Sequence, residues 1–206
     1  MKILSNQIPA YRTAGEAWKA GLNLIERFGD QVITEDRKVT KEVRNLVLQV
    51  LEPSEGWPIL GSGWDLPGLE KYAEQLLSDE NNGFDYTYGE RLRLYPDTGG
   101  IYKMDQIDFL IGRLKDNPTT RRAIAITWVP EWDAIGHHVP CLQLIDFLFR
   151  GGKLNLTAYF RSHDIERAYP CNLYGLNKLL EYVAREAGME PGSITTISAS
   201  AHIYVE

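Results

Sequence analysis

The stretch LQLIDFLFRGGKLNLTAYF, residues 142–160, decides the fold of this sequence. It contains two apolar segments rich in aromatic and branched residues, 142–149 and 154–160, and Gly151-Gly152 lies between them. This pattern is typical of two antiparallel strands, because paired glycines readily adopt the positive φ angles that tight hairpin turns require. The sequence therefore predicts a β-hairpin here.

Outward from this hairpin, the spacing of apolar residues predicts further helices and strands. Apolar residues three or four apart indicate amphipathic helices, whereas runs rich in branched residues indicate strands. The predicted elements are helices over 8–28, 69–77, 104–114 and 173–183, strands over 43–51, 123–128 and 194–205, and loops over 52–68 and 78–84. This succession favours an α+β fold with helices packed on a mostly antiparallel or mixed sheet, in a single domain over residues 1–206.

Composition narrows the class of protein further. The chain has 206 residues, of which 44% are hydrophobic, and a formal net charge of -6. An acidic chain offers no broad cationic surface, so we expect no binding to DNA. No apolar run approaches the roughly 20 residues that span a bilayer, so we expect no membrane segment. With only two cysteines, no C-x-x-C motif and no signal-type N-terminus, the sequence predicts a cytoplasmic protein.

Two arginine-containing motifs are candidates for an anion site. Arg121-Arg122 precedes a predicted strand, and Arg161-Ser162 ends another. Guanidinium groups bind phosphate oxygens bidentately and a hydroxyl adds a donor, so these residues could form a phosphate site. For Arg121 and Arg122 the alternative is a pair of solvated surface charges.

The candidate nucleophile is Cys141, which follows Pro140 and precedes the first strand of the hairpin. The alternative is a small core residue, but nearby arginines would stabilise its thiolate. His202 and Tyr204 are two apart on the last predicted strand, so they should face one side of the sheet. The Asn172 amide could pair with the edge of a pyrimidine, or the residue could cap a helix N-terminus.

These residues, in this order, resemble the folate-dependent thymidylate synthases and the related pyrimidine-nucleotide hydroxymethylases. The resemblance covers 105–204 and rests on four motifs: NPTTRR, PC, RSHDIERAYPCN and HIY. Looser similarities are EDR at 35–37 and YGERLR at 88–93. The family resemblance implies a thymidylate synthase-like fold that forms a homodimer sheet to sheet.

The resemblance also implies a role for each residue. Cys141 would be the thiolate that adds to C6 of dUMP, with Tyr88 and Asn172 in the same catalytic group, and Asn172 would read the uracil edge. Arg37, Arg161 and Ser162 would hold the 5'-phosphate, together with Arg121 and Arg122 of a second subunit. His202 and Tyr204 would contact the sugar, and Asp164 would orient the pterin of the one-carbon donor. No metal is expected.

The donor side of the resemblance departs from the family pattern. Glu70 and Glu74 both lie on the corresponding helix, and Glu74 is the favoured catalytic glutamate because of its distance beyond Arg37. The stretch between that helix and Tyr88 is shorter than in the family and contains no tryptophan, and the family's C-terminal extension has no counterpart here. These departures motivate the expectation that the donor is either methylene-tetrahydrofolate or methylene-tetrahydromethanopterin.

The function implied is reductive methylation of dUMP to dTMP. A hydroxymethylase, in which water instead of hydride reacts with the exocyclic methylene intermediate, is the nearest alternative. A nucleotide-binding relative without turnover is a second alternative, and a cysteine hydrolase that uses Cys141 and His202 is a third.

Overall fold

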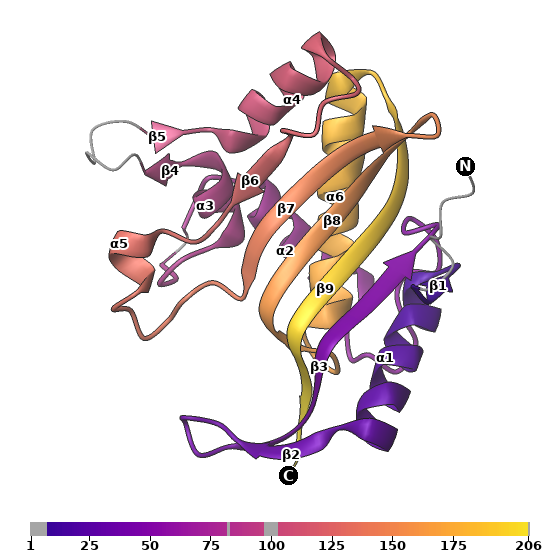
Figure 1. The fold of residues 1–206 in the computed structure, drawn as a ribbon, viewed down its shortest axis with the longest axis vertical. Helices are drawn as coiled ribbons and strands as arrows, with labels where there is room; N and C mark the ends of the chain where they lie inside the picture. The colour runs from indigo at the N-terminus through magenta and orange to yellow at the C-terminus, as the bar shows by residue number, and fades with distance from the viewer. Residues whose placement is uncertain (1–7, 82, 97–102, 206) are drawn as a thin grey trace.

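The protein is built on one long twisted sheet of seven strands (Figure 1). The computed structural model describes residues 8–81, 83–96 and 103–205. The strand order is β1-β3-β9-β8-β7-β6, and β2 pairs with β3. The strands of this sheet are β1 (Ala10–Tyr11), β2 (Asp30–Ile33), β3 (Val39–Val50), β6 (Ile124–Ile126), β7 (Leu142–Arg150), β8 (Lys153–Asp164) and β9 (Glu190–Tyr204). Two short strands, β4 (Tyr95–Pro96) and β5 (Lys103–Met104), form a separate ribbon.

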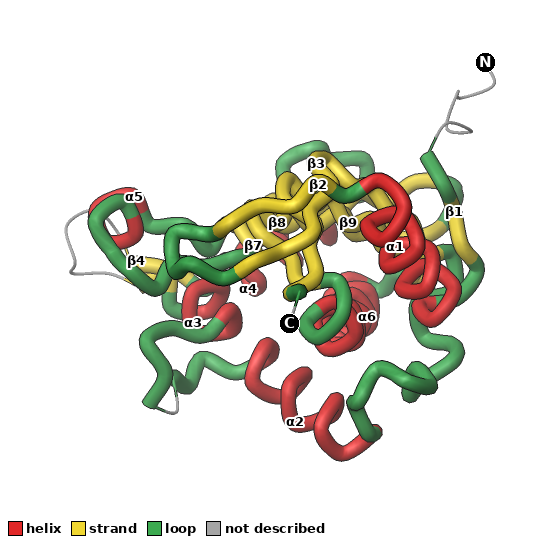
Figure 2. The backbone as a smooth tube through the Cα atoms, turned by 90° about the horizontal axis from the view of Figure 1, so that it is seen from below, coloured by secondary structure: helices red, strands yellow, loops and turns green. Residues whose placement is uncertain are grey.

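Most of the helices gather on one face of the sheet (Figure 2). They are α1 (Ala14–Phe28), α2 (Leu66–Leu77), α3 (Tyr88–Arg93), α4 (Gln106–Asp116), α5 (Pro130–Asp133) and α6 (Tyr169–Ala187). Helix α6 packs on β8 and β9, α1 packs on β3, and α2 lies against α6 as an outer layer. The opposite face of the long strands carries none of these helices in Figure 2.

The predicted hairpin is confirmed, and its second strand is longer than predicted. Gly151 and Gly152 have φ angles of 63° and 80°, as the tight turn requires. Strand β8 continues past residue 160 to Asp164. Arg161 and Ser162 therefore lie on the strand itself, where the ladder to β9 fixes their positions.

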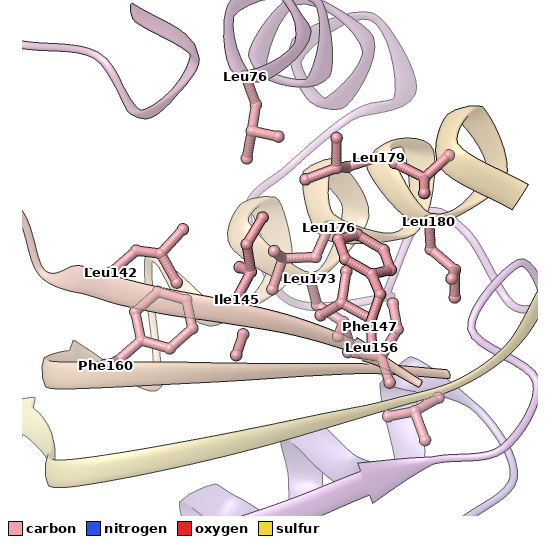
Figure 3. Packing of buried hydrophobic residues seen from close by; sticks show 14 of the residues in the cluster. Leu76, Leu142, Ile145, Phe147, Leu156, Phe160, Leu173, Leu176, Leu179 and Leu180 are labelled. Carbon is pink, nitrogen blue, oxygen red and sulfur yellow. The ribbon is translucent and has the colours of Figure 1, made fainter. Parts of the chain in front are cut away.

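The hairpin and α6 share the hydrophobic core (Figure 3). Strands β7 and β8 direct apolar side chains toward the buried face of the helix, and these side chains exclude water together. The residues are Leu142, Ile145, Phe147, Leu156 and Phe160 from the strands and Leu173, Leu176, Leu179 and Leu180 from α6, all at most 1% exposed. This packing anchors the strand ends that carry the candidate site residues.

The predicted α+β fold class is confirmed, and the sheet is mixed. Neighbours β8 and β9 are parallel, because α6 forms the crossover between them. Most other pairs in the sheet are antiparallel. A single domain over residues 1–206 stays a prediction.

Several element boundaries differ from the predicted ones. Helix α1 begins at Ala14, not residue 8, because Thr13 and Glu16 form a capping box there. Strand β3 begins four residues before the predicted 43, β6 keeps three residues of 123–128, and β9 begins at Glu190, before the predicted 194. Helices α3 and α5 were not predicted, since six and four residues are too few to show helical periodicity.

A glycine on α3 fixes how closely this helix approaches the end of α2. A Cβ atom on Gly89 would lie 2.1 Å from the Ser78 carbonyl oxygen and 2.3 Å from that of Gln75. Backbone atoms cannot yield as a flexible side chain does, so we expect Gly89→Ala to lower the free energy of unfolding by about 1–3 kcal/mol or more.

Gly112→Ala on α4 is the matched control, because nothing lies within 4 Å of the position that a Cβ atom would take there. We expect that variant to be neutral or more stable by up to about 1 kcal/mol. Urea unfolding of both variants measures the difference. Equal stability of the two variants would contradict the close approach of α3 to α2.

Candidate active site

A cavity of about 570 Å³ opens where the β2–β3 hairpin, the start of β7 and the C-terminal ends of β8 and β9 meet. Residues of α2 and of the segments 84–88 and 137–139 complete its wall. Six residues singled out in the sequence line this cavity: Tyr88, Cys141, Arg161, Ser162, His202 and Tyr204. Residues far apart in the sequence thus meet around one thiol.

Arg161 holds the segment that presents the thiol. Its backbone N–H donates to the Cys141 carbonyl oxygen at 2.9 Å. Its guanidinium donates to the carbonyl oxygens of Pro140 and Val139, both at 2.9 Å. On the other side, the Leu142 N–H donates to the Tyr88 hydroxyl at 3.3 Å. Cys141 is therefore fixed between a strand and a helix that both line the cavity.

The electrostatics of the cavity favour neutral groups around the thiol. Burial raises the pKa of Cys141, and the positive charge of Arg161 lowers it. Burial raises the pKa of Tyr86 to about 12 and places the pKa of Tyr88 well above its usual value. Both phenols are thus protonated hydrogen-bond donors at neutral pH, and Arg161 is the group that favours the thiolate of Cys141.

Asn172 lies behind the wall of this cavity. It is 6% exposed and does not line the cavity, but Tyr72, whose hydroxyl donates to Asn172 Oδ1, does. The alternative that Asn172 caps a helix is wrong, because the N-cap position of α6 is Ala168 and Asn172 lies inside the first turn. Its amide instead belongs to a buried hydrogen-bond network.

Glu74 lies apart from the thiol. It is an exposed residue of α2 and lines a second cavity of about 620 Å³, whereas the neighbours Tyr72 and Gln75 line both cavities. Residues three apart lie on one face of a helix, so 72 and 75 form the stripe that reaches Cys141. The spacing along α2 could have identified this stripe from the sequence.

Three predicted phosphate ligands also lie outside the cavity. Arg37 is exposed in the turn between β2 and β3 with a φ of 61°, and its neighbours Glu35 and Asp36 line the cavity instead. Arg121 and Arg122 are exposed just before β6, at the edge strand of the sheet. None of the three contributes to the cavity of its own chain.

Asp164, the predicted pterin residue, lines neither cavity. Its Oδ1 accepts from the backbone N–H groups of Glu166 and Arg167, both at 3.0 Å. The carbonyl oxygen of Arg167 accepts in turn from Trp64 Nε1 at 2.8 Å, and Trp64 lines the second cavity. Asp164 thus supports an aromatic wall that the sequence did not indicate, since Trp64 precedes α2 instead of following it.

The first cavity has few positive charges of its own. Among the described residues that line it, Arg161 is the only arginine or lysine, whereas Glu35, Asp36, Glu42 and Asp85 are carboxylates. A phosphate dianion bound here would meet one guanidinium in this wall, so any further arginine or lysine would have to come from outside it.

The described residues include no group of three or more histidine, cysteine, aspartate or glutamate side chains placed to hold a metal ion. Within that same part of the chain, no helix has the length and apolar character that crossing a bilayer requires.

Comparison with known proteins places the chain among enzymes of nucleotide biosynthesis. The family model described as Thymidylate synthase matches residues 39–206. A protein of Methanosarcina barkeri named "Putative thymidylate synthase" is 50% identical over 195 residues, which cover 94% of this chain and 87% of the relative. Proteins of the same name from Methanothermobacter thermautotrophicus and Methanocaldococcus jannaschii are both 39% identical, over 92% and 88% of this chain and 89% and 83% of each relative.

The two thiols should differ in reactivity. Cys141 is half-buried beside Arg161, whereas Cys171 is 4% exposed and burial raises its pKa to about 12. We expect iodoacetamide at pH 8 to label Cys141 first, because the thiolate is the reactive form.

Arg161→Gln should slow this labelling, since removal of the positive charge raises the pKa of Cys141 further. Peptide mass spectrometry after timed labelling measures both rates. Faster labelling of Cys171, or no change of rate in Arg161→Gln, would contradict the description of the site.

Proposed function

Because the chain belongs to the thymidylate synthase family of methyltransferase-type enzymes, we propose that it converts dUMP to dTMP by reductive methylation through a covalent adduct on Cys141. The observation that carries this proposal is the meeting of Cys141 with Arg161, Ser162, His202 and Tyr204 around one cavity. A thiol, a phosphate-binding pair and two sugar-binding groups match the parts of a pyrimidine nucleotide.

Methylation of uracil requires a nucleophilic group on the enzyme, because C5 of uracil is itself too poor a nucleophile to attack a methylene donor. Addition of the Cys141 thiolate to C6 forms an S–C6 bond and makes C5 an enolate carbon, with negative charge on O4. C5 then attacks the methylene carbon of the donor and loses its proton. Elimination of the pterin amine leaves an exocyclic methylene on the ring. Hydride from the reduced pterin completes the methyl group, releases the thiolate and leaves the pterin oxidised.

The nucleotide would be fixed by its two ends. Arg161 and Ser162 would bind the 5'-phosphate with Arg37 from the adjacent turn, and His202 and Tyr204 would bind the 3'-hydroxyl. Binding energy from these remote groups holds C6 over the sulfur. Asn172 would read the uracil edge, and Tyr88 would support the catalytic segment through its bond to the Leu142 N–H.

We propose that a second copy of the chain supplies the missing positive charge. The face of the sheet that carries no helices in Figure 2 has partly exposed apolar residues, and pairing of two such faces would bury them. Neighbouring positions across this face include Ile126, Leu144, Tyr159, Ile197 and Val47. In such a dimer Arg121 and Arg122 would reach the phosphate held by the other subunit.

The second cavity is our proposed site for the pterin of the one-carbon donor. It adjoins the first through Tyr72, Gln75 and Phe84, so a carbon unit could pass between the two ligands. Trp64 offers an aromatic face for the ring, and Asp164 would act on it through the turn at Arg167. If Glu74 takes part in proton transfer, it would do so from this second cavity, where the donor is proposed to bind. Both methylene-tetrahydrofolate and methylene-tetrahydromethanopterin are proposed donors, and the relatives from methanogens favour the second.

The reaction is tested by incubating the protein with dUMP and each donor in turn, followed by mass analysis of the nucleotide. We expect a gain of one carbon and two hydrogens, the mass change of methylation. A hydroxymethyl product would show instead that water reacts with the intermediate, and an unchanged nucleotide with both donors would contradict turnover.

The covalent step is tested with 5-fluoro-dUMP, whose C5 fluorine cannot leave as a proton does. In the presence of the active donor we expect a stable complex on the protein, seen as added intact mass. Cys141→Ala should abolish it because no S–C6 bond can form. Cys171→Ala is the matched control and should retain it, and an adduct that survives in Cys141→Ala would refute the assigned nucleophile.

A further inference from the structure

Four polar side chains form a buried chain of hydrogen bonds from the cavity wall into the sheet. Tyr72 of α2 contacts Asn172 Oδ1 of α6. Asn172 Nδ2 lies 3.2 Å from His163 Nε2 of β8, and His163 Nδ1 lies 2.9 Å from Ser198 Oγ of β9. His163 and Ser198 are 2% and 1% exposed, so water cannot replace these contacts.

The chemistry of each group fixes the direction of the chain. An amide nitrogen only donates, so Asn172 Nδ2 donates to His163 Nε2. A neutral imidazole carries one proton, so Nδ1 must carry it and donate to Ser198 Oγ. At the other end the phenol donates to the carbonyl oxygen of Asn172.

The environment of His163 keeps its ring neutral. The ring stacks on Phe160, with centroids 3.9 Å apart and planes 15° from parallel. Burial, with a smaller contribution from His202, lowers the pKa of His163 to about 3. A protonated ring would have two donors and could not accept from Asn172, so neutrality preserves the chain at physiological pH.

The direction of these hydrogen bonds fixes which atom of the Asn172 amide contacts Tyr72 and which contacts His163. Oδ1 accepts from Tyr72, which lines the cavity, and Nδ2 donates to His163. Asn172 itself lies behind the cavity wall, so a bound pyrimidine would contact the amide beside Tyr72. The chain uses one lone pair of Oδ1 and one hydrogen of Nδ2, so one acceptor site and one donor site remain. Uracil presents a donor at N3 and an acceptor at O4, which fit these remaining sites. Cytosine presents an acceptor at N3 and a donor at N4, which do not.

We propose that His163 is a positioning residue that fixes the direction of the Asn172 amide and thereby makes the site select uracil over cytosine nucleotides. The inference rests on the proposed function, since it assumes that the cavity binds a pyrimidine nucleotide. Ser198 acts in the same chain, because it holds the proton on Nδ1 of the imidazole.

Removal of the Ser198 hydroxyl should change the preference between uracil and cytosine nucleotides in a definite direction. Without Oγ, a proton on Nδ1 has lost its acceptor, whereas a proton on Nε2 can still donate to Asn172. The tautomer therefore changes, and the amide turns so that Nδ2 faces the cavity. Ser198→Ala should shift the nucleotide preference toward cytosine, although Ser198 does not contact Asn172 and acts on it through His163.

The experiment measures the Kd of the full chain for dUMP and for dCMP by calorimetry, which needs no turnover. The variants are His163→Phe, which keeps an aromatic ring for stacking on Phe160, and Ser198→Ala. In both we expect the ratio of the two Kd values to move toward dCMP by about tenfold or more, since buried polar groups are otherwise left unpaired. Cys171→Ala, a buried residue beside Asn172 but outside the chain, should keep the ratio of the unmodified protein.

The outcomes separate this inference from the proposed function. A folded His163→Phe or Ser198→Ala that keeps the original ratio overturns the inference and leaves the proposed function standing. An unmodified protein that binds neither nucleotide, or that prefers dCMP, overturns the proposed function. Should His163→Phe not fold, Ser198→Ala decides alone, because it removes one buried oxygen and leaves the ring in place.

Discussion

The site depends on the hydrogen bonds that Arg161 donates to the segment 139–141. One residue of β8 binds three successive carbonyl oxygens, those of Val139, Pro140 and Cys141, through its side chain and its backbone. The pairing of β8 with β7 and β9 sets the position of this residue, and the core under the hairpin holds the strands. The fold thus places a thiol and a positive charge side by side.

The same arrangement gives the first cavity little positive charge, and it divides the site into two adjoining cavities. Arg161 uses its guanidinium on the backbone as well as facing the cavity, and the carboxylates nearby oppose an anion. This shortage is the physical argument for a second subunit that contributes Arg121 and Arg122. Tyr72 and Gln75 stand where the two cavities join, so the proposed transfer of a carbon unit takes place beside the buried network that ends at Ser198.

The sequence was sufficient to predict the elements whose residues follow a local pattern. The Gly151-Gly152 hairpin and the helices with apolar stripes were predicted because each follows from local periodicity or turn chemistry. Helices α3 and α5 and the parallel pairing of β9 depend on contacts far along the chain, which no local pattern contains. Strand β8 was predicted too short because its last four residues are polar and do not continue the apolar pattern of the strand.

The site shows the same division. Cys141 directly precedes β7, whereas Arg161 and Ser162 lie within β8, beyond the predicted end of that strand, and all three line the first cavity. Glu74 was chosen by distance along the sequence, and it lines the second cavity but not the one that contains the thiol. His163 gave no signal, because a histidine in a strand is ordinary until its partners on α6 and β9 are known.

A crystal structure of the protein with dUMP bound would test directly whether Cys141 is the nucleophile of a pyrimidine-nucleotide site. In that structure we expect Cys141 Sγ to lie beneath C6 of the pyrimidine, at contact or bonding distance, with the phosphate on Arg161 and on guanidinium groups from a second copy. A nucleotide bound elsewhere, or bound here with C6 out of reach of the sulfur, would contradict it.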